Sequence, residues 1–173
     1  MLKFTQGHVT PWWDNSFKKL NFINYPLTNV EDIQKWLDEG YGGFTFGGAV
    51  FNMKQQLPDY SQPFFKLFDW EHVGISYFRL NTMHAVPMHQ DGYPGFIERN
   101  RVITLSRIRK CIVFLEDWKS GHYLEVEGTP FVKWSAGDYV IWKYDAEHYA
   151  ANIGQDPRYT MQITGLSKID NDF

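Results

Sequence analysis

The clearest helical spacing of hydrophobic residues lies in the stretch TNVEDIQKWLDEG, at positions 28–40. Apolar residues repeat there every three or four positions and so share one face of a helix. Thr28 and Glu31 fit a capping box at its start, and Gly40 fits a C-terminal stop. A helix is therefore predicted here, and a shorter helical turn is predicted at 63–70. The residues of the apolar face are Val30, Ile33, Trp36 and Leu37.

From position 73 onward the hydrophobic pattern changes to short runs rich in Val, Ile, Tyr, Phe and Trp. Gly, Pro, Asp or Asn bounds most of these runs, which is the pattern of strands joined by turns. One further strand is predicted before them, at 43–51. The other predicted strands are 73–83, 102–106, 110–115, 123–126, 131–134, 138–143, 148–153 and 159–165.

A helix followed by many short strands predicts a mainly β protein, a jelly roll with a small N-terminal helical layer. Other β-sandwiches share this pattern. The 18% aromatic content adds to the tendency toward strands, and the aromatics of PWWDN and FDWEH are expected in the core or a lid. Without repeats or linkers, a single domain is expected over 1–173. Within it, 1–72 would supply the helix and supporting strands, and 73–166 the jelly-roll core.

Charge and cysteine content narrow the class of protein. The formal net charge of −3 gives no general attraction for phosphate backbones, so nucleic acid is not expected as a partner. A single cysteine, Cys111, excludes an internal disulfide and suits a reducing compartment. The first residues contain no apolar run typical of a signal peptide, and no stretch of 18 apolar residues occurs. We therefore expect a soluble, cytoplasmic protein without a membrane partner.

Candidate chemistry begins at the motif MHQDGY, which places His89 and Asp91 two positions apart. From composition alone, roughly 0.7 matches to a His-x-Asp/Glu pattern are expected by chance in this chain. The pair therefore needs further ligands before it indicates a metal site. A ferrous site of the facial type requires a second histidine. His148 directly follows a predicted strand and is the main candidate, with His84 and His122 as minor alternatives.

Two further residues extend the pattern. Arg158 comes ten positions after His148, and Thr160 lies on the same face of a predicted strand. The order His89-x-Asp91, His148, Arg158-x-Thr160 resembles the His-x-Asp…His…Arg-x-Ser/Thr signature of the 2-oxoglutarate and Fe(II)-dependent dioxygenase superfamily. Composition gives a chance of roughly 0.01 for the whole set. The resemblance covers 73–165. Within the superfamily, the sequence is similar to prolyl hydroxylase-like and aspartyl/asparaginyl hydroxylase-like members, and to short stand-alone oxygenases of bacterial viruses.

The resemblance implies a double-stranded β-helix of the cupin type, with Fe(II) held by His89, Asp91 and His148. It also implies 2-oxoglutarate and O2 as cosubstrates. Arg158 would pair with the far carboxylate of 2-oxoglutarate, and Thr160 would donate a further hydrogen bond. Tyr77 is a further candidate for contact with the cosubstrate. Oxidative decarboxylation to succinate would then be coupled to hydroxylation of a small molecule or a peptide side chain.

Several alternatives stay open at this point. The basic run ERNRVITLSRIRK could attract an acidic or phosphorylated substrate, or form a solvated pair of strands. Arg79 is either a ligand contact or a surface group. A jelly-roll binding protein without catalysis would share the fold, but the ligand set and Arg158 argue against it. A cupin-type isomerase or cofactor-free dioxygenase has no need of Arg158 and Thr160.

Overall fold

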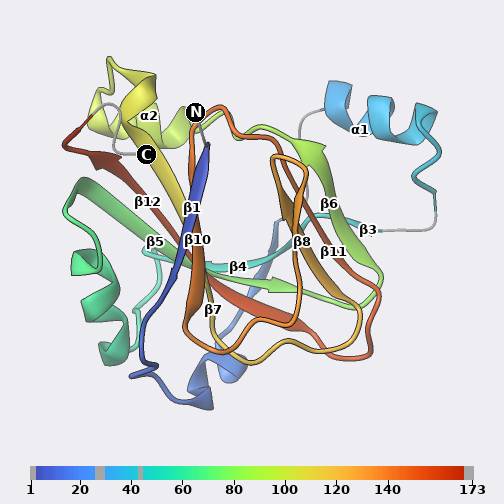
Figure 1. Cartoon of the computed structure of the whole chain (residues 1–173), viewed down its shortest axis with the longest axis horizontal. Coiled ribbons are helices and arrows are strands. Elements are labelled where there is room, and N and C mark those ends of the chain that lie inside the picture. Colours follow the sequence, from blue (N-terminus) through green and yellow to red (C-terminus); the bar gives the residue numbers. More distant parts are fainter. Residues whose placement is uncertain (1–2, 26–29, 43–44, 170–173) are drawn as a thin grey trace.

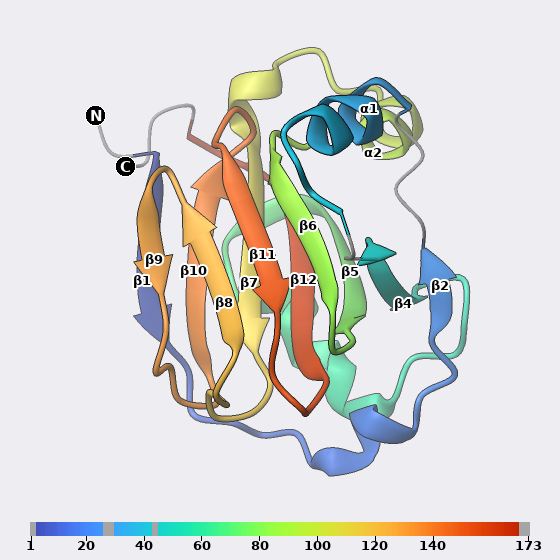
Figure 2. The same cartoon turned by 90° about the vertical axis from the view of Figure 1, so that its right-hand side faces the viewer.

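The computed structural model describes residues 3–25, 30–42 and 45–169, and folds them into two sheets that face one another as a sandwich (Figures 1 and 2). All strand pairs are antiparallel except β3 with β6. The larger sheet has the order β1 (Phe4–His8), β10 (Asp138–Lys143), β7 (Ile108–Phe114), β12 (Arg158–Ser167), β5 (Trp70–Leu80), β4 (Gly48–Asn52) and β2 (Ile23–Tyr25). The smaller sheet has the order β3 (Thr45–Phe46), β6 (His84–His89), β11 (His148–Asn152), β8 (His122–Val126) and β9 (Thr129–Phe131).

The helices are short and lie around the sandwich. Helices α1 (Val30–Asp38) and α2 (Pro94–Asn100) lie at one end of it, where β6 finishes (Figure 2). The described residues also form three 3₁₀ helices, η1 (Asn15–Lys19), η2 (Asp59–Lys66) and η3 (Leu105–Arg107). No helix in the described part of the chain is long and apolar enough to cross a membrane. The expected mainly β jelly roll with a small N-terminal helical layer is confirmed.

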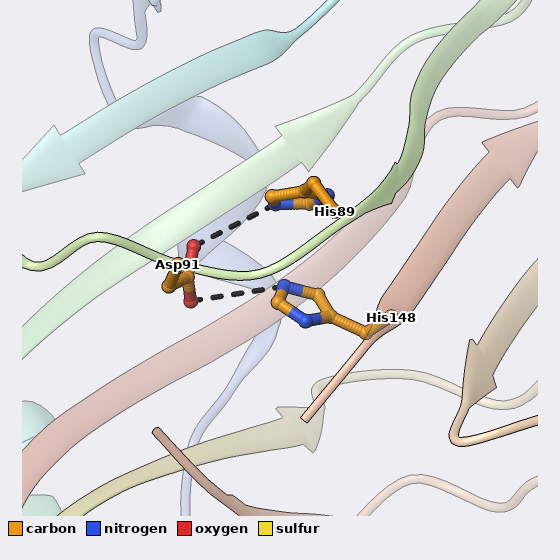
Figure 3. Close-up of side chains that lie close together, drawn as sticks. All are labelled: His89, Asp91 and His148. Atoms are coloured by element: carbon orange, nitrogen blue, oxygen red, sulfur yellow. Dashed lines mark ion pairs between the residues drawn. The ribbon is translucent and has the colours of Figure 1, made fainter. Parts of the chain in front are cut away.

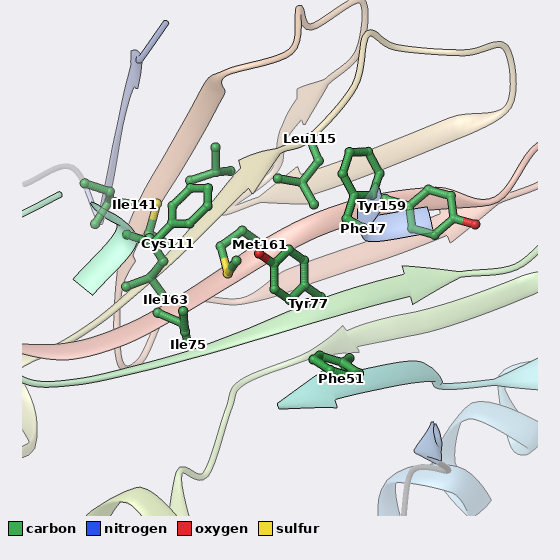
Figure 4. Close-up of a cluster of buried hydrophobic side chains, with 12 residues drawn as sticks. Phe17, Phe51, Ile75, Tyr77, Cys111, Leu115, Ile141, Tyr159, Met161 and Ile163 are labelled. Carbon is green, nitrogen blue, oxygen red and sulfur yellow. The ribbon is translucent and has the colours of Figure 1, made fainter. Parts of the chain in front are cut away.

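Two apolar cores follow from the alternation of side chains along the strands. One core lies between the sheets and joins Leu80, Phe114, Leu124 and Trp142 from β5, β7, β8 and β10. The other lies on the outer face of the larger sheet, where the N-terminal region covers it. Figure 4 shows this outer cluster. Its buried members are Phe17, Phe51, Phe64, Ile75, Tyr77, Cys111, Val113, Leu115, Ile141, Tyr159, Met161 and Ile163.

The aromatic residues of the N-terminal region hold it against this outer face. The indole N–H of Trp12 donates to the carbonyl of Tyr60, and that of Trp13 donates to the carbonyl of Leu115, both at 2.9 Å. Trp13 also stacks obliquely on Phe64, with ring centroids 5.3 Å apart. These contacts place the PWWDN aromatics in the core, as expected from the sequence.

Most predicted elements of the C-terminal part are confirmed within a few residues. The strand predicted at 138–143 is β10, and those at 110–115, 123–126 and 148–153 correspond to β7, β8 and β11. Helix α1 confirms the helix expected at 28–40, although the capping residue Thr28 lies outside the described residues. Trp36 is buried as predicted, but Leu37 is exposed. The helical turn predicted at 63–70 is the 3₁₀ helix η2, which begins and ends earlier.

Two predicted strands need correction, and one strand was not predicted. The run 102–106 is not a strand, because Arg101 ends α2 in the left-handed region (φ 50°) and the chain then enters η3. Ile103, within that run, is 96% exposed and has no sheet to pack on. The strand expected at 43–51 is two strands, β3 and β4, while Gly43 lies outside the described residues. Strand β6 was not predicted as a separate strand, because Pro87 interrupts the pattern of a strand.

Candidate metal centre

His89 and His148 are brought together by the register of the smaller sheet. His89 is the last residue of β6, His148 is the first residue of β11, and the two are directly opposite partners in the antiparallel ladder. Asp91 lies two residues beyond β6, in the loop that leads to α2. One ligand atom from each of the three residues lies within 4.8 Å of the others. Figure 3 shows Asp91 facing both imidazole rings.

The hydrogen bonds of the two histidines fix which nitrogen faces Asp91. His89 Nδ1 lies 2.7 Å from the carbonyl of Pro87, and His148 Nδ1 lies 3.1 Å from the carbonyl of Ala146. A protonated Nδ1 donates to each carbonyl, which leaves Nε2 as the free lone pair. Both Nε2 atoms point at the carboxylate, 3.6 Å and 3.7 Å from its two oxygens. Such support from backbone carbonyls is typical of histidines that bind metals.

The electrostatics of the three residues suit a cation. Burial lowers the pKa of His148 to about 4, so this imidazole is neutral at physiological pH. Burial opposes ionisation of Asp91, but the nearby His148, His89 and Lys110 outweigh it and hold its pKa well below the usual range. Asp91 Oδ2 is buried without a hydrogen-bond partner among the described residues. Two imidazoles and one carboxylate form the donor set of a facial ferrous site, and the group fits such an ion.

Arg158, the first residue of β12, lies in the same cavity as these three residues. The cavity has a volume of about 370 Å³, and we call it the inner cavity. The guanidinium is buried, and one of its nitrogens, Nη1, donates to the carbonyl of Tyr123. Burial lowers the pKa of Arg158 to about 10, which still leaves it charged at neutral pH. Its Nε–H has no hydrogen-bond partner in the described structure.

Thr160 lies on the same face of β12 as Arg158, because side chains two positions apart on a strand point the same way. Its hydroxyl is also buried and has no partner among the residues that the structure describes. Buried polar groups are nearly always hydrogen-bonded, so two neighbouring orphaned groups need an explanation. Arg158 and Gln162, on either side of Thr160 along this strand face, line the inner cavity, and a carboxylate bound beside Arg158 would satisfy both groups. The residues present therefore fit the far end of a 2-oxoglutarate molecule.

The structure contradicts the expectation that Tyr77 contacts a cosubstrate. Its side chain points to the outer face of the larger sheet, where its hydroxyl lies 2.6 Å from that of Ser61 (Figure 4). Burial raises the pKa of Tyr77. Arg79 shares this outer face, and its guanidinium lies 4.9 Å above the ring centroid of Phe22. The inner cavity is lined instead by their neighbours on β5, Ser76 and Phe78.

The minor alternatives among the histidines lie outside the metal group. His84 Nδ1 lies 3.0 Å from the carbonyl of Thr82, and His122 Nε2 lies 2.8 Å from that of Asp156. Neither belongs to the group of His, Cys, Asp and Glu side chains that could share an ion in the described residues. The three residues that the resemblance implied as ligands are therefore the ones that the fold brings together.

One residue of the inner cavity was missed as an individual candidate. Lys110, on β7, lines the cavity, and its ammonium donates to Gln162 Oε1 at 3.1 Å. The signal was present in the sequence, because Lys110 alternates with the inward-facing Ile112 and Phe114. The basic run that contains it does not act as one surface: Arg107 pairs with Glu71 at 2.6 Å.

Comparisons with known proteins place the fold. No family model matches the sequence, and no curated protein matches it. Among solved structures, the chain is similar to the non-heme alpha ketoglutarate dependent carbocyclase SnoK from nogalamycin biosynthesis. The TM-score is 0.57 at 12% identity, over 87% of this chain and 81% of that one. It is also similar to a prolyl-4-hydroxylase from Pseudomonas putida, with a TM-score of 0.55 at 12% identity, over 80% and 83% of the two chains. At this identity the likeness shows the shared jelly-roll fold alone.

Proposed function

We propose that this protein is an Fe(II)- and 2-oxoglutarate-dependent dioxygenase. It would couple the oxidative decarboxylation of 2-oxoglutarate to succinate with the hydroxylation of a small molecule or a peptide side chain. One observation carries the proposal: Arg158, with an orphaned N–H, shares a cavity with a His-Asp-His group, and the orphaned hydroxyl of Thr160 lies on the same face of β12. The fold shared with two enzymes of this chemical type supports it.

His89, Asp91 and His148 would hold the ferrous ion from one side and leave its other positions open. Asp91 supplies a single negative charge, so the centre keeps a net positive charge that favours a dianionic chelator. The bound ion would supply the redox chemistry with oxygen. Trp142 packs on His148, with ring centroids 4.9 Å apart, and Trp36 packs edge-on against His89 at 6.4 Å. These two indoles exclude water from the backs of both imidazoles.

Arg158 and Thr160 would bind and orient the cosubstrate. A guanidinium presents parallel N–H donors that match the two oxygens of a carboxylate. A buried charge without a partner is costly, and the described structure gives Arg158 only a backbone carbonyl. A bound carboxylate would offset that cost, and the hydroxyl of Thr160 would donate to the same group. These contacts set the depth at which the other end of the molecule meets the metal.

A non-catalytic metal-binding jelly roll of the cupin type is the competing function. Such a protein would use the same three ligands, but nothing in that role requires a buried arginine in the cavity with an unpartnered N–H, or an unpartnered threonine hydroxyl on the same strand face. The two functions therefore differ in whether 2-oxoglutarate binds, and not in whether a metal binds.

The test is anaerobic titration of the Fe(II)-loaded protein with 2-oxoglutarate, followed by exposure to oxygen. We expect a visible charge-transfer band on titration, and slow formation of succinate with oxygen even without a second substrate. Loading with Zn(II) in place of Fe(II) is the control, because zinc has no redox chemistry and should give neither signal. Metal binding without either signal in the Fe(II) protein would contradict the proposal and favour the cupin-type alternative.

A further inference from the structure

The inner cavity continues into a second one, which we call the outer cavity. It has a volume of about 470 Å³ and shares Asp91, Lys110 and Gln162 with the inner cavity. Residues of α2 and of the segment after β4 form its walls, and Arg158, His89 and His148 do not line it. The outer cavity therefore reaches the metal group from the side of Asp91, away from the proposed cosubstrate arginine.

The charged side chains of the outer cavity are strongly biased toward cations. Lys54, Arg99 and Lys110 line it, and among the described residues Asp91, the proposed metal ligand, is the only acid that does. Within the described residues, no carboxylate lies within 4 Å of the charged nitrogens of these three cations. Elsewhere on the molecule such pairs are common, as between Lys18 and Glu116 at 2.6 Å. A chain with a formal net charge of −3 thus gathers unpaired positive charge at this cavity.

Lys110 is the cation placed for contact with a ligand near the metal. The ammonium of Lys110 has three donors, and among the described residues only Gln162 accepts a hydrogen bond from it. Burial lowers the pKa of Lys110, while the charge of Asp91 raises it, so the lysine lies within electrostatic reach of the metal group. Burying this charge is unfavourable unless a counter-charge completes its environment.

Lys110 and Arg158 belong to different parts of the site. Gln162, the partner of Lys110, follows Arg158 by four positions on β12, which is about 13 Å along a strand at roughly 3.3 Å per residue. Lys110 lines both cavities, whereas Arg158 lines the inner cavity and not the outer one. The two cations can therefore hold two different anionic groups at once, one on each side of the metal group.

We propose that the second substrate is an anionic small molecule that binds in the outer cavity, with its carboxylate or phosphate paired to Lys110. Exposed Arg99 and Lys54 at the rim would attract it, and the bond to be oxidised would lie beside Asp91. This inference rests on the proposed function, because it assumes that metal and 2-oxoglutarate occupy the inner cavity.

The experiment uses the Zn(II) protein saturated with 2-oxoglutarate, which binds but does not turn over. The probes are matched pairs: carboxylic acids with their primary amides, and phosphate monoesters with their parent alcohols. Dissociation constants are measured by ligand-observed NMR and calorimetry. We expect the anionic member of a pair to bind at least tenfold more tightly than the neutral one. The class of pair that shows the preference distinguishes a carboxylate from a phosphate substrate.

Variants assign the preference to Lys110. Lys110→Met should weaken binding of the anionic probe at least tenfold, and Lys110→Arg should restore most of it. Lys66→Met is the matched control, because it removes the same charge from an exposed position that lines neither cavity. Arg99→Gln, at an exposed position where folding is not at risk, should weaken binding by about twofold to threefold, as expected for a screened surface charge.

The outcomes separate this inference from the proposed function. The charge-transfer band with Fe(II) and 2-oxoglutarate is recorded for the parent and for Lys110→Met. Suppose that the parent shows the band. If it then binds neutral probes as tightly as anionic ones, or binds no probe, the inference is overturned and the proposed function is not. An anionic probe that binds Lys110→Met and the parent with equal affinity also overturns the inference. Loss of the band in Lys110→Met would show that Lys110 binds the cosubstrate, and this would also overturn the inference. A parent protein that lacks the band would contradict the proposed function itself.

Discussion

His89 and His148 face each other across one antiparallel ladder, with their ring centroids 4.2 Å apart. They come from strands that are distant in sequence, so their meeting depends on the register of β6 with β11. A shift of one residue would turn a side chain to the other face of the sheet. A bulge between His148 and Ala150 adjusts the ladder at this point. Paired strands therefore supply two of the three residues of the metal group, and a loop supplies the third, Asp91.

The first prediction concerns the metal. His148→Ala should abolish stoichiometric binding of Fe(II) or Zn(II), because it removes one of three ligands and leaves too few donors for a stable site. His84→Ala is the matched control, since His84 lies on the neighbouring strand segment and bonds only to a backbone carbonyl. Metal content after dialysis, measured by elemental analysis, checks both variants. Equal metal content in His148→Ala and the parent would remove His148 from the site.

The second prediction separates the cosubstrate from the metal. Arg158→Met should leave metal content unchanged and weaken 2-oxoglutarate binding by about a hundredfold or more, because a desolvated charge pair is lost. Arg107→Met is the control, since Arg107 pairs with Glu71 near the surface. The charge-transfer band of the Fe(II) protein, titrated anaerobically, measures the affinity. An unchanged titration midpoint in Arg158→Met would show that the far carboxylate binds elsewhere.

Thr160 allows a finer test, because its hydroxyl has no partner in the described structure. Thr160→Val removes the hydroxyl and keeps nearly the same shape. The ligand-free protein should therefore lose no stability, since no hydrogen bond is broken. Binding of 2-oxoglutarate should weaken by about fivefold, which corresponds to one hydrogen bond of about 1 kcal/mol. Denaturant unfolding and the same anaerobic titration measure the two effects. Marked destabilisation of the ligand-free variant would mean that Thr160 has a structural partner after all.

The sequence could indicate which residues the fold brings together, because the spacing of these residues depends on short stretches of chain. His148 and Arg158 each begin a strand, and their spacing is set by β11 and the short loop that leads from it to β12 in the other sheet. The His-x-Asp pair is likewise set by one strand end. Such short-range relationships survive in a sequence even where no family model matches it. The pairing of β6 with β11 is long-range, and the sequence could only suggest it through the resemblance.

The face of a strand that points into the cavity is harder to predict from the sequence. Strand β5 is covered on both sides, with Ile75 and Tyr77 in the outer core and Ser76 and Phe78 at the inner cavity. A strand buried on both faces shows no polar and apolar alternation, so its inward side cannot be read from composition. The sequence therefore leaves Tyr77 as a candidate for the cavity as well as for the core. Lys110 is hard to single out from the sequence for a different reason, because the arginines beside it are typical of a solvated basic run.

The corrected position of Tyr77 yields the last prediction. Tyr77→Phe removes the hydroxyl that bonds to Ser61 and leaves the buried Ser61 hydroxyl without this partner. We expect the free energy of unfolding to fall by about 1–3 kcal/mol, the cost of an unsatisfied buried group. Metal and 2-oxoglutarate binding should not change, because the side chain lies on the far side of the sheet from the inner cavity. The double variant Ser61→Ala with Tyr77→Phe should recover part of the lost stability, since both partners are then removed. If Tyr77→Phe instead weakened 2-oxoglutarate binding at full stability, its side chain would have to reach the cavity, and the facing of β5 described here would be wrong.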